Sequence, residues 1–304
     1  MAEKCNLCPR NCNVDRSVNT GVCQTRGVTL SRVGKHMWEE PCISGQNGSG
    51  TVFFAGCSLR CRFCQNYDIT VRPHGVTVSP ERLADVFLHL QDVGVDNINL
   101  VTPSHFAPSI AKALTLAKPK LTVPVVYNTS SYEKVSALNM FDGLVDVYLA
   151  DLKFCSAQLS EKLCNAPNYF EVATKAIGEM RRQQPQDVFD GNGMMKRGLI
   201  IRHLVVPGCV EDTKLVLDWI AQFDKDTYIS LMSQYFPARQ DDKFEELNRH
   251  LFKHEYDNAV QYFINVGLRN GFAQDILSAT MDYLPSFSDE DVQQVLEKAP
   301  HVFN

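Results

Sequence analysis

Short apolar runs alternate with amphipathic helices along most of this chain, and this alternation limits the folds open to it. The runs predicted to be buried strands lie at residues 48–56, 97–101, 123–127, 145–149, 199–206 and 227–232. Helical periodicity is found between them, at residues 79–90, 107–117, 133–140, 158–183 and 212–223. Strands that alternate with helices in this way pair in parallel, and the helices cover the sheet. The pattern predicts an α/β fold.

The number of β–α units limits the choice of architectures. Six β–α units are too few for a closed eight-stranded barrel, so we expect a partial (β/α)6 barrel or a doubly wound sheet. In both architectures the functional side chains gather at the carboxyl ends of the strands. The residues predicted to lie there are Cys57, Thr102, Ser104, His105, Asn128, Asp151 and Lys153.

The alternation stops near residue 236, and the sequence on either side of it differs in character. We expect a cysteine-rich cap at residues 1–47, a core barrel at residues 48–236 and a C-terminal helical extension at residues 237–304. Within the extension, charged helices are predicted at residues 241–256 and 258–266. The extension is expected to pack on the barrel.

Localisation and partner class follow from what the sequence lacks. Residues 1–30 are polar, without the apolar segment of a signal peptide, and no apolar run approaches the roughly 20 residues that cross a bilayer. A net charge of −5 gives no electrostatic reason to expect binding to nucleic acid or anionic lipid. We therefore expect a cytoplasmic protein with neither a nucleic-acid nor a membrane partner.

Cysteine usage points to metal chemistry. The chain has 11 cysteines, and seven of them fall in two tight clusters. Reducing compartments do not sustain structural disulfides, so metal or redox chemistry becomes the leading explanation for these clusters.

The second cluster follows directly after the first predicted strand and consists of Cys57, Cys61 and Cys64. Three thiolates can hold a [4Fe–4S] cluster and leave one iron open to bind a further molecule, whereas a cluster that only carries electrons normally has a fourth cysteine. Zinc is the alternative metal, but it would need another ligand, such as His74.

A Cys-x3-Cys-x2-Cys motif after a strand, with Phe63 before the third cysteine, resembles the signature of the radical S-adenosylmethionine (SAM) superfamily. The resemblance implies a partial barrel. It also implies that the amino and carboxylate groups of SAM bind the open iron, and that an electron from the cluster cleaves SAM to a 5′-deoxyadenosyl radical. Residues 48–236 are further similar to pyruvate formate-lyase-activating enzymes, and the N-terminal Cys-Asn-Leu-Cys-Pro-Arg-Asn-Cys is similar to a branch without one established reaction.

This resemblance assigns roles to several residues. Phe63 is expected beside the adenine of SAM, and Arg202 is expected to help position the cofactor. Asp151 and Lys153 match an Asp-x-Lys strand end that faces the SAM carboxylate or an associated cation. An ordinary salt bridge at the end of a strand is the alternative for this pair.

Two positions depart from the resemblance. Thr102, Ser104 and His105 stand where many members carry a Gly-Gly-Glu segment, and their hydroxyl and imidazole groups could accept hydrogen bonds from the SAM amine. His105 is also a candidate for proton transfer to or from the substrate, although a structural role explains it equally well. Asn128 replaces an aspartate, and a neutral amide cannot supply the same charge to a cation.

The first cluster supplies four thiolates within 19 residues, from Cys5, Cys8, Cys12 and Cys23. Four thiolates suit a closed zinc site or a second iron–sulfur cluster. Zinc would act as a structural cap, and a second cluster would relay electrons inward. The sequence does not decide between them, although a structural metal is slightly favoured.

The function implied by the resemblance is hydrogen abstraction from a glycine or another position of a protein or peptide substrate, as in glycyl-radical activation. An external reductant such as flavodoxin or ferredoxin would supply the electron. A small-molecule substrate is the first alternative. The second is a non-catalytic iron–sulfur or zinc protein that carries electrons or serves as a scaffold, which would explain the cysteines but not the barrel.

Overall fold

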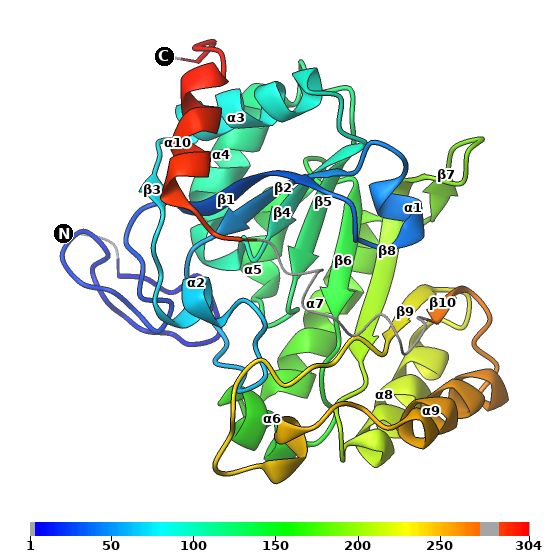
Figure 1. Ribbon diagram of the computed structural model, residues 1–304. Coiled ribbons are helices and arrows are strands. Elements are labelled where there is room, and N and C mark those ends of the chain that lie inside the picture. The colour runs from blue at the N-terminus through cyan, green and yellow to red at the C-terminus, as the bar shows by residue number, and fades with distance from the viewer. Residues whose placement is uncertain (1–3, 274–285, 304) are drawn as a thin grey trace.

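A computed structural model describes residues 4–273 and 286–303, and the described residues form a ten-stranded sheet (Figure 1). The six predicted strands are present as β2 (Ser49–Phe54), β4 (Asn97–Val101), β5 (Val125–Thr129), β6 (Val147–Asp151), β8 (Met195–Leu204) and β9 (Tyr228–Met232). Neighbouring members of this set pair in parallel. The prediction of an α/β fold with a parallel sheet is confirmed.

The helices between these strands pack against the sheet in one apolar core. They are α3 (Pro80–Asp92), α4 (Ala107–Ala117), α5 (Val135–Leu138), α6 (Ala157–Cys164), α7 (Tyr169–Gln183) and α8 (Val210–Phe223). The first of them begins where the sequence indicates, because Ser79 accepts a hydrogen bond from the Arg82 amide and proline follows it. No helix in the described part of the chain is both long and apolar enough to cross a bilayer.

An antiparallel strand that the sequence did not reveal lies beside the parallel set. It is β1 (Thr29–His36), which pairs with β2 and with the short β3 (Val76–Thr77). The chain then turns into the short helix α1 (Pro41–Ser44), whose Cys42 and Ile43 pack with side chains of β5, β6 and β8. Residues 37–40 therefore cross from one edge of the sheet toward its middle.

Two further short strands lie toward the other edge of the sheet. The hairpin strand β7 (Val188–Phe189) pairs antiparallel with β8. The strand β10 (Gly271–Ala273) extends the parallel set by pairing with β9.

The predicted helix at residues 241–256 is wrong. Residues 245–248 form only a 3-10 turn, η3 (Glu245–Asn248), and the helix α9 (Lys253–Asn265) covers only the last residues of the first predicted segment but nearly all of the second. The Asp241 carboxylate accepts hydrogen bonds from the Lys243 and Phe244 amides. Such a local turn competes with helix formation.

A last helix, α10 (Asp289–Lys298), was not predicted, and it packs on β1 and α3 (Figure 1). Residues 274–285 and 304 of the predicted C-terminal extension lie outside the described residues.

Two side chains of α3 hold the C-terminal segment in place. Arg82 donates hydrogen bonds to three carbonyl groups, those of Leu296, Ala299 and Pro300. Asp85 is 1% exposed, forms an ion pair with Arg82 and accepts hydrogen bonds from the amides of Val302 and Phe303. The α10 segment is therefore fixed by buried polar groups as well as by apolar packing.

We predict that Asp85→Ala lowers the free energy of unfolding by about 3 kcal/mol, because it removes the carboxylate that neutralises the Arg82 charge and leaves two amides without their acceptor. Urea denaturation measures this loss, and limited proteolysis should show faster cleavage after residue 285. Asp289→Ala is the control, because the Asp289 side chain is 50% exposed. Equal stability of the two variants would contradict the prediction.

Candidate active site

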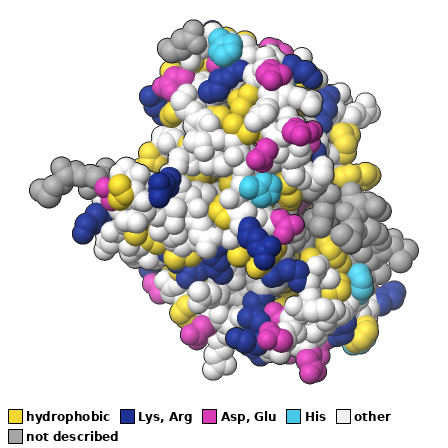
Figure 2. All heavy atoms as spheres, turned by 60° about the vertical axis from the view of Figure 1, so that its left-hand side comes forward, with side chains coloured by type: hydrophobic (Ala, Val, Ile, Leu, Met, Phe, Trp, Pro, Cys, Tyr) yellow, Lys and Arg dark blue, Asp and Glu magenta, His cyan; other side chains and the backbone are white. Residues whose placement is uncertain are grey.

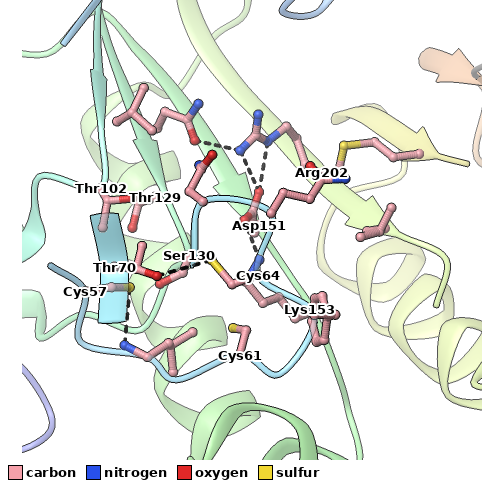
Figure 3. Close-up of a pocket in the computed structure, with 18 of the residues that line it drawn as sticks. Cys57, Cys61, Cys64, Thr70, Thr102, Thr129, Ser130, Asp151, Lys153 and Arg202 are labelled. Atoms are coloured by element: carbon pink, nitrogen blue, oxygen red, sulfur yellow. Dashed lines mark hydrogen bonds and ion pairs between the residues drawn. The ribbon is translucent and has the colours of Figure 1, made fainter. Parts of the chain in front are cut away.

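A cavity of about 260 Å³ opens at the carboxyl ends of the parallel strands. Cys57, Cys61 and Cys64 line it from the loop that follows β2 (Figure 3). Most of the predicted cofactor-binding residues line the same cavity, namely Phe63, Thr102, Asn128, Asp151, Lys153 and Arg202. The fold thus brings together residues that lie far apart in the sequence.

The loop that carries the three cysteines is shaped by its contacts. Gly56 has a φ of +80°, and a Cβ atom there would lie 2.2 Å from the Cys23 carbonyl oxygen, so only glycine fits. Further along, the Arg62 amide donates to the Leu163 carbonyl over 2.8 Å, and the Arg60 amide donates to the Cys164 carbonyl over 3.3 Å. The loop is therefore held at both ends by backbone contacts.

The three thiols are buried and close to one another. Burial, together with the neighbouring Cys61 and Cys64, raises the pKa of Cys57 to about 12. The pKa of Cys64 is also raised, by burial and by Cys61. Such thiols stay protonated until a metal displaces their protons, which is the behaviour of metal-binding cysteines before loading.

The donor set fits a [4Fe–4S] cluster better than a single ion. Among the described residues, no three Cys, His, Asp or Glu side chains meet closely enough to hold one metal ion. Three cysteines around a shared cavity match a four-iron cluster, in which each thiolate binds a different iron.

Cys164 at the end of α6 contacts this site, although no pattern in the sequence indicated it. Its sulfur lies 3.4 Å from the sulfur of Cys61. This contact is the largest cause of the raised pKa of Cys61, and burial adds to it. A solitary cysteine more than a hundred residues away carries no spacing signal that could have identified it.

Three charged residues line the cavity beside the cysteine loop (Figure 3). The Lys153 Nζ lies 2.6 Å from Asp151 Oδ2, and the Arg202 Nη2 lies 2.9 Å from Asp151 Oδ1. Arg202 also donates to the Asn128 side-chain oxygen over 2.6 Å. Burial opposes ionisation of Asp151, but the charges of Arg202 and Lys153 outweigh it and lower the Asp151 pKa.

Comparison with known proteins identifies the family. Residues 51–197 match the family model described as the radical SAM superfamily, and the matched segment contains all three cysteines. Residues 51–197 therefore belong to the radical SAM superfamily. A [4Fe–4S] cluster and SAM are the cofactors typical of this superfamily, and the thiols and charged groups of the cavity fit them.

The individual proteins that are similar to this chain share less than a third of its residues. An uncharacterized protein of Methanocaldococcus jannaschii is 29% identical over 269 residues, which cover 85% of this chain and 74% of the relative. SuiB of Streptococcus suis, solved with bound SAM, is 13% identical with a TM-score of 0.49, and the match covers 78% of this chain. The match spans about half of SuiB, 52% of its chain.

Two further solved structures are also similar. Methylornithine synthase (PylB) is 13% identical with a TM-score of 0.49, over 83% of this chain and 80% of that protein. A domain of the pyruvate formate-lyase-activating enzyme of Bacteroides vulgatus is 14% identical with a TM-score of 0.39, over 55% of this chain and 90% of that domain.

Ser104 and His105 do not line the cavity of this radical SAM protein, in contrast to the prediction. His105 is 2% exposed, and its Nε2 lies 2.7 Å from the Ala55 carbonyl oxygen. Burial lowers the pKa of His105 to about 4, so the imidazole does not titrate near neutrality. Ser104 is 4% exposed and lies in the same short turn. These residues pack beneath the site, and neither faces a cofactor or substrate in the cavity.

Thr102 is the member of this segment that does line the cavity. Its φ is +61°, a left-handed conformation that is uncommon for a residue with a branched side chain. Its amide donates to the Asn128 carbonyl over 2.9 Å, which ties this turn to the end of β5. Strained backbone of this kind often occurs at functional sites.

Glu39 and Glu40 also line the cavity, and the sequence did not indicate them. The Arg202 Nη1 lies 3.5 Å from Glu39 Oε2 and 3.8 Å from Glu40 Oε1. Burial, together with the negative charge of Glu40, raises the pKa of Glu39 to about 7. Two adjacent acidic residues were the only sequence signal, and such pairs are common on solvated surfaces.

The N-terminal cysteines gather at a second place beside the cysteine loop. Burial and the nearby thiols of Cys12, Cys23 and Cys5 raise the pKa of Cys8 to about 11, so the four thiols are neighbours. Arg10, between two of them, donates to the Ser58 carbonyl over 2.7 Å and lies over the Tyr132 ring. The four cysteines therefore face one another on a segment that contacts the radical SAM cysteine loop.

The raised pKa of Glu39 predicts a pH dependence of stability. Unfolded, this carboxyl loses its proton near pH 4.5, whereas in the fold it loses it near pH 7. Between these values the folded state binds a proton that the unfolded chain has released, so stability falls as the pH rises through this window, by up to about 3 kcal/mol.

Glu39→Gln cannot ionise, and its free energy of unfolding should fall less than that of the wild type between pH 4.5 and pH 7. Urea denaturation across this range measures both slopes. Glu171→Gln is the control, because its side chain is 69% exposed. A Glu39→Gln slope equal to that of the wild type would refute the assignment.

Proposed function

We propose that this radical SAM enzyme cleaves SAM reductively at a [4Fe–4S] cluster held by Cys57, Cys61 and Cys64, and abstracts hydrogen from a protein or peptide substrate. When bound, the cluster supplies the electron that splits SAM into methionine and a 5′-deoxyadenosyl radical, which removes a hydrogen atom from the substrate. The observation that carries the proposal is the shared cavity of the three thiols and the charged residues Asp151, Lys153 and Arg202.

The residues of the cavity would bind SAM according to their chemistry. Lys153 donates to Asp151, and an ammonium group has three donors, so it can also bind the SAM carboxylate. Phe63 offers an aromatic surface for the adenine from within the cysteine loop, where Phe154 supports its ring edge-on at 5.8 Å. Thr102 and Asn128 contribute polar groups at neighbouring strand ends. Ser104 has no part in this proposal.

The substrate class rests on two different observations. Similarity of residues 48–236 to activating enzymes favours a protein or peptide, whose target residue would enter the cavity. The cavity itself, at about 260 Å³ and with polar groups at several strand ends, suits a small molecule as the second candidate. The non-catalytic alternative does not explain why the thiols line a cavity at the strand ends.

An external reductant is needed, because radical SAM enzymes take up an electron for each cleavage. Outside Cys61 lies a second hollow, lined by three arginines and two aspartates, which are Arg60, Arg62, Arg239, Asp241 and Asp242. Figure 2 shows several Lys and Arg side chains together on the middle and lower part of the face that carries the N-terminal residues. Arg62 is paired with the two aspartates, so the arginines leave only a small positive excess beside the cluster, which suits an acidic electron carrier such as flavodoxin or ferredoxin.

The N-terminal cysteines are proposed to hold a separate metal group that fixes the cap. Cys8 has the other three thiols around it, and Gly21 leaves room for Cys12, whose sulfur would lie 2.9 Å from a Cβ atom there. A structural zinc ion and a second iron–sulfur cluster remain the two forms of this proposal, and a single zinc ion would require the thiols to draw closer together than they lie in the described residues.

We predict that the reconstituted protein, reduced with dithionite, forms 5′-deoxyadenosine from SAM, and that Cys61→Ala lowers this to background together with the iron content. Chromatography of the products and iron analysis measure both. Cys155→Ala is the control, because Cys155 does not line the cavity among the described residues. Absence of 5′-deoxyadenosine from wild-type protein with an intact cluster would refute the enzyme proposal. Deuterium transfer from labelled peptides or small molecules would identify the substrate.

We predict that a Cys5/Cys8/Cys12 triple alanine variant loses one metal group and keeps the cluster at Cys57. Iron and zinc analysis of anaerobically purified wild type and variant measures this. Loss of zinc alone identifies a structural site and excludes an electron relay, whereas loss of iron identifies a second cluster. Unchanged metal content would contradict metal binding by these cysteines.

A further inference from the structure

We infer that the inner end of the cavity, at Glu39 and Glu40, binds a substrate group that carries a cationic nitrogen, either an ammonium or a guanidinium. This inference deepens the proposed function, because it assigns the substrate class of the cavity in which SAM is proposed to be cleaved. Both residues precede the segment that matches the radical SAM family model, residues 51–197.

The fold places these two carboxylates away from the cysteine loop. His36 at the end of β1 pairs with Ser49 at the start of β2, whereas the cysteines follow the end of β2. The next helix, α1, packs its Cys42 and Ile43 against β5, β6 and β8. Residues 37–40 therefore close the inner end of the cavity, and their carboxylates face the same space as the thiols.

The charges at this end do not balance. Three carboxylates, from Glu39, Glu40 and Asp151, share two cations, Arg202 and Lys153. The shortest ion pairs of both cations are with Asp151, at 2.6 and 2.9 Å, and the glutamates lie at 3.5 and 3.8 Å from Arg202. The SAM carboxylate, bound as proposed, would also pair with the positive charge of Lys153. If all three carboxylates were ionised, the glutamates would have an excess of negative charge, and burial together with this excess raises the pKa of Glu39 to about 7.

Hydrogen bonding at this end is also incomplete. The Glu40 side chain is 4% exposed, and its Oε2 has no hydrogen-bond partner among the described residues. Asn99 of β4 is fully buried next to Glu39, and neither its side-chain oxygen nor its nitrogen forms a hydrogen bond of ordinary geometry with a described residue. Buried polar atoms without partners are costly, so these atoms indicate a ligand that would complete them.

A cationic nitrogen is the group that meets both requirements. Its N–H donors would pair with Glu40 Oε2, and its charge would neutralise the excess on the glutamates. A carboxylate would be repelled, and a hydroxyl would leave the charge unbalanced. A metal ion is disfavoured, because no three acidic, His or Cys side chains of the described chain meet at one point.

The test compares three ligands of equal chain length on reconstituted protein with SAM under anaerobic conditions. They are n-butylamine, 1-butanol and butyrate, and equilibrium dialysis measures the binding of each. We expect butylamine to bind at least about tenfold more tightly than butanol, and butyrate not to bind.

Variants at Glu40 refine the test. Glu40→Gln should weaken butylamine binding by about tenfold or more, whereas Glu40→Asp, which keeps the charge, should retain most of it. Glu171→Gln, at an exposed position, should not change it. Circular dichroism and iron content show whether each variant is folded and loaded, and the wild-type comparison of the three ligands needs no variant.

Equal binding of butylamine and butanol to the wild type would overturn the inference, as would full butylamine binding by a folded Glu40→Gln variant. Formation of 5′-deoxyadenosine is measured on the same wild-type sample. SAM cleavage without a preference for butylamine would refute this inference alone. A preference for butylamine without SAM cleavage would support the binding site and refute the proposed function.

Discussion

The Arg202 guanidinium joins three neighbouring strands of the sheet to the segment that precedes α1. From β8 it contacts Asp151 of β6, Asn128 of β5 and the Glu39 carboxylate of the segment that precedes α1. Its side chain is 14% exposed, so its charge depends on these partners for stability. Arg202 therefore orients the Asp151 carboxylate, and Asp151 in turn binds Lys153. Asn128 therefore has a role of its own here, as a hydrogen-bond acceptor for Arg202.

The two cysteine motifs are mechanically linked. The Cys23 carbonyl lies so close to Gly56 that no side chain fits between them, and Gly56 directly precedes Cys57. Arg10 donates to the carbonyl of Ser58, the residue that follows Cys57. A metal group held by the N-terminal cysteines would thus stiffen the loop that holds the other cluster, whether or not it also carries electrons.

Much of the fold could be predicted because its signals are local. Buried parallel strands are continuous apolar runs, and the motif of Cys57, Cys61 and Cys64 has a fixed spacing at the end of such a run. The antiparallel strand β1 was missed because its buried and half-buried positions depend on pairing with distant residues. The helix at residues 241–256 was predicted wrongly because propensity does not reveal that the Asp241 side chain caps a turn instead.

The candidate site was predictable only in part, for a related reason. A predicted position at the end of a strand shows that a residue lies near the site, but it does not show where the side chain of that residue points. Thr102 faces the cavity, whereas His105, three residues later, faces the Ala55 carbonyl inside the core. Glu39 and Glu40 come to the site through the packing of α1 on three distant strands, and no local pattern records such a contact.

The outcome is a cavity with electrical polarity. Lys153 and Arg202 border the space next to the cysteine loop, and Glu39 and Glu40 border the inner end. SAM carries a carboxylate that the cations can bind, and a substrate with a cationic nitrogen would be drawn past them toward the glutamates. The same charges would turn an acidic substrate away from the inner end, because its carboxylate would meet Glu40 without a cation to spare. Bound as proposed, the two molecules would lie along one axis, with the SAM carboxylate at the cations and the substrate's charged group at the glutamates.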